Sequence, residues 1–113
     1  MSSPSLTSAM LHILLALSHR ERHGYDIMKQ VEEDSSGSIR LGPGTLYGAI
    51  KRMLQDELIE ETEERDAEDE RRRVYRLTKI GRTILKQELT RMEDVVHLAQ
   101  RRKLLPLQSP KRA

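Results

Sequence analysis

The chain has 113 residues, no cysteine, 34% charged residues and a formal net charge of +2. This length fits one domain, and the absence of cysteine excludes disulfides and thiolate-bound metal. No apolar run approaches the roughly 20 residues that span a bilayer, and the N-terminus does not resemble a signal peptide. We therefore expect a cytoplasmic protein without a membrane partner. Its aliphatic core, which lacks Phe and Trp, is thin and favours oligomerisation.

Two short helices are predicted first. Apolar residues recur at spacings of three and four over residues 5–17, which is typical of one helix face. A second helix is predicted over residues 24–34, and the dense Ser and Gly of residues 33–38 end it.

A third helix is predicted over residues 43–57, after a Gly-Pro-Gly sequence. Pro43 suits the first helical position, because its φ is fixed and it has no N–H group to leave unpaired. Gly44 has no Cβ, so the backbone there can approach a ligand closely. A helix N-terminus also attracts phosphate through its free N–H groups. These features favour contact with something negatively charged.

This third helix is predicted to have two faces. The inward stripe is Leu46, Tyr47, Ile50, Met53 and Leu54, and the outward residues are Thr45, Gly48, Lys51, Arg52 and Gln55. The cations Lys51 and Arg52 suit a groove-entering helix, although an ordinary solvated face is the alternative. Tyr47 is either a DNA contact or a core residue with its hydroxyl at the rim.

Two short antiparallel strands are predicted over residues 58–65 and 71–77. Residues 60–70 hold eight acids and one base, and three arginines follow at 71–73. Acids on one strand are expected to face arginines on the other. This internal neutralisation is the alternative to DNA contact by the arginines. Phosphate would repel the acidic tip, so any DNA contact is expected from the arginine strand.

A long last helix is predicted over residues 79–103, with Thr78 as its N-cap. Its apolar residues alternate four and three apart, a heptad seam that prefers a partner helix. The seam comprises Leu85, Leu89, Met92, Val96 and Ala99, and packing within one chain is the alternative. We expect a DNA-binding domain at residues 1–78, a dimerisation helix at 79–105 and a flexible tail at 106–113.

The predicted fold is mainly α with a small β-hairpin. Three helices, two strands and a last helix indicate a winged helix-turn-helix, whose third helix enters the major groove. The competing interpretation is a winged-helix module that binds a protein partner through this helix or the acidic hairpin. No phosphate-loop pattern, metal-ligand cluster or nucleophile–base set is present, so we expect no enzyme, no cofactor and no metal.

Four sequence blocks in this order resemble the PadR family of bacterial transcriptional regulators. They are HGYDIMKQV (23–31), LGPGTLYGAIKRM (41–53), DELIEE (56–61) and RRRVYRLTKIGRTIL (71–85). The resemblance covers about residues 6–98, and the single last helix is similar to that of short-form members.

The resemblance implies a repressor that dimerises through its last helix, binds a pseudo-palindromic operator in double-stranded DNA and is released by a small-molecule effector. It implies DNA contacts at Tyr25, Arg40, Gly44, Thr45, Tyr47, Lys51 and Arg52, with wing contacts or supports at Arg72, Arg73 and Tyr75. Some members stack flat ligands on a Trp that this chain lacks. Candidate effector-lining residues between the first and last helices are Met10, Leu14, Met92 and Val96, and ordinary dimer packing is the alternative.

Overall fold

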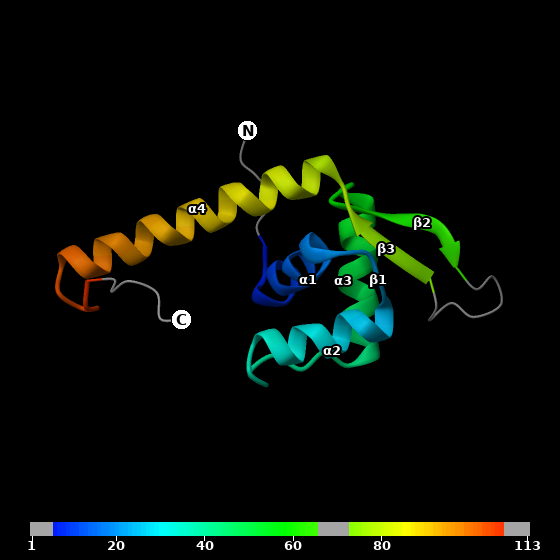
Figure 1. Ribbon diagram of the computed structural model, residues 1–113, viewed down its shortest axis with the longest axis horizontal. Coiled ribbons are helices and arrows are strands. Elements are labelled where there is room, and N and C mark those ends of the chain that lie inside the picture. The colour runs from blue at the N-terminus through cyan, green and yellow to red at the C-terminus, as the bar shows by residue number, and fades with distance from the viewer. Residues whose placement is uncertain (1–5, 66–72, 108–113) are drawn as a thin grey trace.

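The computed structural model describes residues 6–65 and 73–107 (Figure 1). The elements are α1 (Ser8–His19), β1 (Arg22–His23), α2 (Gly24–Asp34), α3 (Pro43–Gln55), β2 (Ile59–Arg65), β3 (Arg73–Leu77) and α4 (Lys79–Arg101). The elements α1 to β3 gather into one body, here called the N-terminal unit, while most of α4 extends away from it (Figure 1). The mainly helical fold with a small hairpin and a long last helix confirms the prediction.

Side chains cap three of the four described helices at their N-termini. Thr7 caps α1, His23 caps α2 and Thr78 caps α4, each by accepting a backbone N–H of the first turn. By contrast, α3 follows Gly42 without a side-chain cap from any described residue. The first N–H groups of α3 therefore lack the side-chain acceptor that the other helices have.

The sheet contains a third strand that the sequence analysis missed. The strand order is β1-β3-β2, and both pairings are antiparallel. In β1, Arg22 lies opposite Tyr75 and His23 lies opposite Val74. A strand of two residues inside a polar run has no alternating pattern, so periodicity gave no signal for it.

Arg22 ties β1 to the helices on either side. Although charged, it is only 4% exposed. Its Nε donates to the carbonyl of Ala16 in α1 at 2.9 Å, and a terminal nitrogen donates to Asp26 of α2 at 3.0 Å. This buried guanidinium therefore has both a hydrogen-bond acceptor and a counter-charge, as burial requires.

The core is aliphatic, as the composition predicted. Its largest fully enclosed side chains come from α1, α2, α3 and the turn into β2: Ile13, Leu14, Ile27, Val31, Leu46, Met53, Leu58 and Ile59. Within α4, Gly81 and Leu85 are the buried residues. The start of α4 therefore belongs to the core, and its later turns do not.

A tight junction joins α4 to the turn between α3 and β2. Glu57 has φ 61° and ends α3, and the N–H of Leu58 returns to the Met53 carbonyl at 2.9 Å. The Thr78 hydroxyl lies 2.6 Å from the Glu57 carbonyl oxygen and 3.0 Å from that of Leu58. Gly81 packs so closely that a Cβ on it would overlap the Leu58 carbonyl. This contact fixes the direction in which α4 leaves.

Left-handed residues also explain why two helices end earlier than predicted. Glu57 stops α3 at Gln55, and Lys103, with φ 62°, follows the end of α4 at Arg101. The chain then turns back, and the Gln100 side chain donates to the Pro106 carbonyl at 3.1 Å. Residues 108–113 of the expected tail and the acidic tip at 66–70 lie outside the described residues. Among the described helices, none is long and apolar enough to cross a membrane.

We expect Gly81→Ala to lower the free energy of unfolding by about 1–3 kcal/mol, because the added methyl overpacks the junction. Urea denaturation of the purified protein measures this change. Gly48→Ala in α3 is the matched control, since a Cβ there meets no described atom within 4 Å. That control is expected to gain about 0.5–1 kcal/mol from the better helix former. Equal effects of the two substitutions would contradict the tight junction.

Candidate nucleic-acid interface

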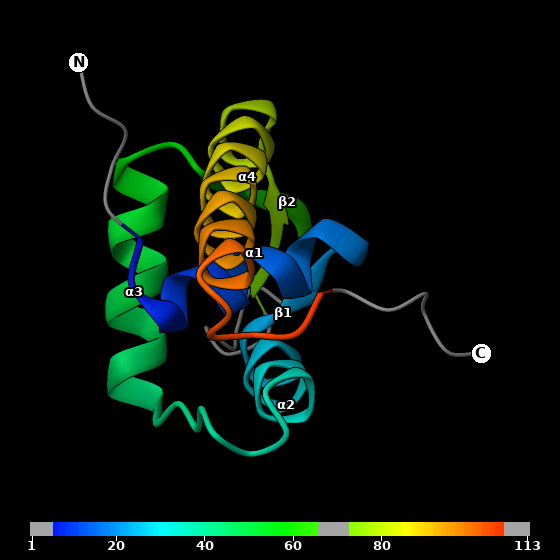
Figure 2. The ribbon, with the colours of Figure 1, turned by 90° about the vertical axis from the view of Figure 1, so that its left-hand side faces the viewer.

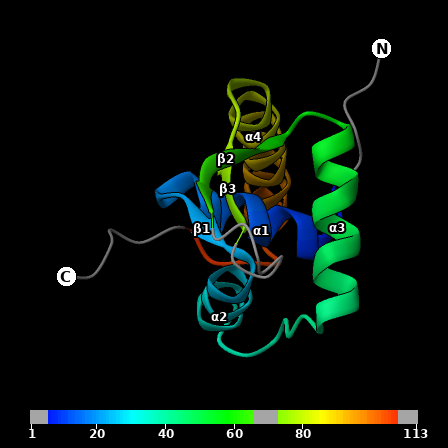
Figure 3. The same ribbon diagram turned by 90° about the vertical axis from the view of Figure 1, so that its right-hand side faces the viewer.

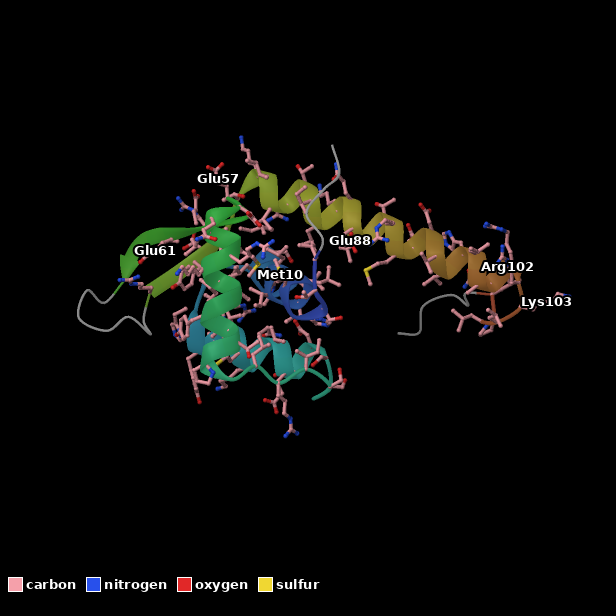
Figure 4. All side chains as sticks on the ribbon, turned by 180° about the vertical axis from the view of Figure 1, so that it is seen from behind. Met10, Glu57, Glu61, Glu88, Arg102 and Lys103 are labelled. Carbon is pink, nitrogen blue, oxygen red and sulfur yellow. The ribbon has the colours of Figure 1, made fainter. Side chains whose placement is uncertain are left out.

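The helix α3 presents the polar face that its sequence predicted. Leu46, Ile50 and Met53 are buried against the core. The outward residues are all exposed: Thr45, Gly48, Lys51, Arg52 and Gln55. Seen from behind, α3 lies in front of the rest of the N-terminal unit (Figure 4). Its two cations are therefore accessible to a ligand on this side.

The beginning of α3 faces open space. A Cβ placed on Gly42 or Gly44 would meet none of the described atoms within 4 Å. No side chain of the described residues caps this helix, and the helix dipole places partial positive charge at its N-terminus. An anion such as a phosphate can therefore approach these N–H groups directly.

Tyr47 packs α3 against the start of α2. Its ring lies over Gly24, where a Cβ would stand 2.9 Å from the Tyr47 Cζ. Tyr47 is half-buried, which agrees with a packing residue. The close approach of the two helices thus depends on the absence of a side chain at Gly24.

Tyr25 begins the exposed edge of α2. It is 60% exposed, and the Lys29 Nζ lies 5.6 Å from its ring centroid. This distance allows a cation–π interaction. Lys29 was not among the predicted contact residues, although its spacing of four from Tyr25 places both on one helix face.

Three predicted arginines each lie beside a carboxylate of their own chain. The Nε-to-oxygen distances are 3.6 Å for Arg40–Glu32, 3.4 Å for Arg52–Asp56 and 3.5 Å for Arg73–Glu61. The cross-strand pairing expected of the hairpin is present in Arg73–Glu61 and again in Arg76–Glu60, at 2.7 Å. The hydrogen bond to Glu60 and the charge of Glu60 raise the pKa of Arg76, which keeps this guanidinium charged.

One predicted hairpin residue lies in the core. Tyr75 is only 3% exposed and belongs to the core, so it supports the hairpin from inside. Glu61 lies opposite Tyr75 on β2, where Figure 4 labels it. Arg72 lies outside the described residues. Arg73 is partly exposed at the start of β3.

These residues gather at one end of the molecule. The ends of β2 and β3 at Arg65 and Arg73 lie on the same side of the molecule as the start of α2. The free end of α4 lies on the opposite side (Figure 1). Figure 3 looks at the first side and shows α3, the hairpin and α2 together, with α4 behind them. A single long ligand can therefore reach all three elements.

Beyond the junction, α4 carries an exposed apolar stripe. Leu89, Met92 and Val96 are exposed and Ala99 is partly exposed. Leu85, the first residue of the predicted seam, is 3% exposed and belongs to the core of this chain, so the exposed stripe begins at Leu89. Figure 2 looks nearly along α4, with its free end toward the viewer. This stripe is covered by no described part of the same chain.

The candidate effector residues are divided between the core and the surface. Met10 and Leu14 are buried in the core, whereas Met92 and Val96 are exposed on α4. In Figure 4, Met10 lies on α1 close to α4. The two groups therefore differ in their exposure within one chain.

The three-helix arrangement, the antiparallel sheet behind it and the cationic outer face of α3 together define a winged helix-turn-helix regulator that binds DNA. The chain belongs to the transcriptional regulator PadR-like family, which it matches over residues 13–87. It is accordingly a regulator and not an enzyme.

Individual relatives agree with this assignment. A PadR family transcription regulator from hypervirulent Clostridium difficile R20291 superposes with a TM-score of 0.69 at 29% identity, over 84% of this chain and 97% of that chain. The transcriptional regulator Rv3488 of Mycobacterium tuberculosis is 34% identical over 85 residues, or 75% of this chain and 76% of the relative.

A longer relative contains a similar segment. An uncharacterized 37.1 kDa protein in transposon TN4556 of Streptomyces fradiae is 39% identical over 80 residues, which are 71% of this chain. The match spans only 21% of that relative's own length.

We expect Gly24→Ala to lower the free energy of unfolding by about 1–3 kcal/mol, because the methyl group displaces the Tyr47 ring. In a Tyr47→Ala background, the same change is expected to have little effect, since the ring is gone. The double-mutant cycle measured by urea denaturation isolates this coupling. Additive effects of the two changes would show that the ring and Gly24 do not compete for space.

Proposed function

We propose that the protein is a dimeric repressor that binds a pseudo-palindromic operator. The observation that carries this proposal is α3: its N-terminus is open and uncapped, and its outer face holds Lys51 and Arg52. Membership of the PadR-like family supports the regulatory role. A protein that binds chromosomal operators would act in the bacterial cytoplasm.

The proposed contacts fall into two kinds. The first N–H groups of α3, Thr45 and Tyr25 would bind phosphates, which fix the register on the duplex. Lys51 and Arg52 lie further along α3, where side chains can reach base edges in the major groove. Arg73 of the hairpin would lie beside the adjacent backbone.

The proposed dimer forms through α4. The apolar stripe of Leu89, Met92 and Val96 is exposed in one protomer, and its spacing of three and four suits a partner helix. Two copies would then place their α3 helices about 34 Å apart, which is one turn of DNA.

We expect Met92→Lys to shift the protein from dimer to monomer, because a charge in the stripe must be desolvated on association. Sedimentation equilibrium measures the change in dimer dissociation constant. Thr90→Lys is the control, since Thr90 lies in the same stretch of α4 but on its other side. If Met92→Lys and Thr90→Lys leave the dimer dissociation constant equally unchanged, the interface lies elsewhere.

We expect Lys51→Ala and Arg52→Ala each to weaken operator binding by about tenfold while the dimer stays intact. The operator is first selected from random duplexes, and affinity is then measured by fluorescence anisotropy at several salt concentrations. Lys86→Ala, which removes an exposed cation from α4, is the control and should bind as the parent does. If the parent protein does not bind duplex DNA even at low salt, the alternative of a protein-interaction module is favoured.

Release by a small molecule is part of the same proposal. Met92 and Val96 are exposed in the protomer and lie in the proposed interface, where flexible methionines adapt to varied ligands. Met10 and Leu14 are core residues, so they would support such a site from the interior and would not form its open surface. An effector would act by favouring a dimer whose two α3 helices no longer match the operator spacing.

A further inference from the structure

Of the three paired arginines that the sequence predicted as DNA contacts, Arg52 and Arg40 lie beside helix C-termini. The Arg52 Nε lies 3.4 Å from the Asp56 carboxylate, and the Arg40 Nε lies 3.6 Å from that of Glu32. Both arginine side chains remain open to solvent, with exposed fractions of 68% for Arg52 and 75% for Arg40. Each guanidinium is thus partly neutralised and still accessible to a ligand.

Helix stability does not account for the position of these carboxylates. Asp56 is the C-cap residue of α3, and Glu32 lies in the last turn of α2, which contains no base. Negative charge at a helix C-terminus opposes the helix dipole. In addition, an acid placed four residues after its base, as Asp56 is after Arg52, is the less favourable order for a helical ion pair.

Such a pair has different consequences for random and for specific DNA. Binding to an arbitrary duplex depends almost wholly on phosphate neutralisation, and a carboxylate beside the cation reduces that contribution. At the operator, a guanidinium can bind a guanine edge with two nitrogens. In both pairs the carboxylate lies nearest to Nε and not to the terminal nitrogens, and such a contact limits the rotamers that binding must freeze.

We propose that Asp56 and Glu32 are specificity-determining residues of this regulator. They lower its affinity for arbitrary duplex DNA more than its affinity for the operator. Both are positioning residues, because they act through Arg52 and Arg40 and need not touch DNA themselves. This proposal rests on the proposed DNA-binding function.

The test compares operator and arbitrary-sequence affinities of Asp56→Asn with those of the parent. The substitution removes the charge, keeps the shape of the side chain and retains the backbone N–H groups that close α3. We expect affinity for arbitrary duplex to rise about two- to fivefold, the range set by an exposed ion pair. The ratio of operator to arbitrary affinity should fall by a similar factor, and the salt dependence for arbitrary duplex should steepen by up to about one unit of slope.

Three further variants separate positioning from a general charge effect. Glu32→Gln should act like Asp56→Asn, and Asp56→Glu, which keeps the charge, should restore the parent's ratio. Glu88→Gln is the matched control, because Glu88 pairs with Arg91 on α4, away from α3. It changes the net charge equally and should leave the ratio as it is. Urea denaturation should show that Asp56→Asn is at least as stable as the parent.

The outcomes distinguish a failure of the role of Asp56 and Glu32 from a failure of the proposed DNA-binding function. A parent protein that selects no sequence from random duplexes would overturn the proposed function itself. A selective parent whose ratio is unchanged in Asp56→Asn, or is changed equally by Glu88→Gln, would overturn only the role of these carboxylates.

Discussion

The close approach of Gly81 to the Leu58 carbonyl is the constraint on which the arrangement of the whole molecule depends. It is held by Thr78, whose hydroxyl reaches the carbonyls of the turn after α3 and accepts the N–H of Gly81. The later turns of α4 have no buried residue. The direction of a helix about 34 Å long is therefore set at its first turn. A change of roughly 10° at the junction would move the far end by roughly 6 Å.

This junction also links the two functions proposed for the chain. Leu58 lies in the short turn that follows α3, and its N–H bonds back to the Met53 carbonyl, so the same turn joins α3 to the start of α4. In Figure 4, Glu57 lies at this meeting point, while Arg102 and Lys103 lie at the free end of α4. A force applied to α4 by a partner or a ligand would consequently reach α3 through the backbone contacts of this turn.

Much of this fold could be predicted because each helix combines apolar periodicity with a start signal. Thr78 and Pro43 mark helix starts that the structure reproduces. The strand β1 could not be predicted, because it is a strand only through its pairing with the distant β3, where Arg22 lies opposite Tyr75, and no local pattern encodes that pairing. Likewise, the heptad spacing of α4 runs through Leu85 without a break, so sequence alone cannot show that the protomer itself covers this residue.

The candidate site shows the same division. The outward face of α3 follows from its 3.6-residue period, and the Arg52–Asp56 pair follows from a spacing of four. The pairing of Arg40 with Glu32 depends on how the chain turns after α2, and no local pattern encodes it. The contact of Tyr47 with Gly24 likewise requires the packing of α3 on α2.

The repeat of the α4 stripe has a consequence for how such regulators diverge. Seven residues of helix advance about 10.5 Å while returning the stripe to nearly the same side. That distance is about three base pairs of duplex DNA. In the proposed dimer, gain or loss of one heptad beyond Leu89 would slide the protomers along each other with little rotation. Because three base pairs are only part of a turn, such a change would take the two α3 helices out of register with an operator whose halves lie one turn apart.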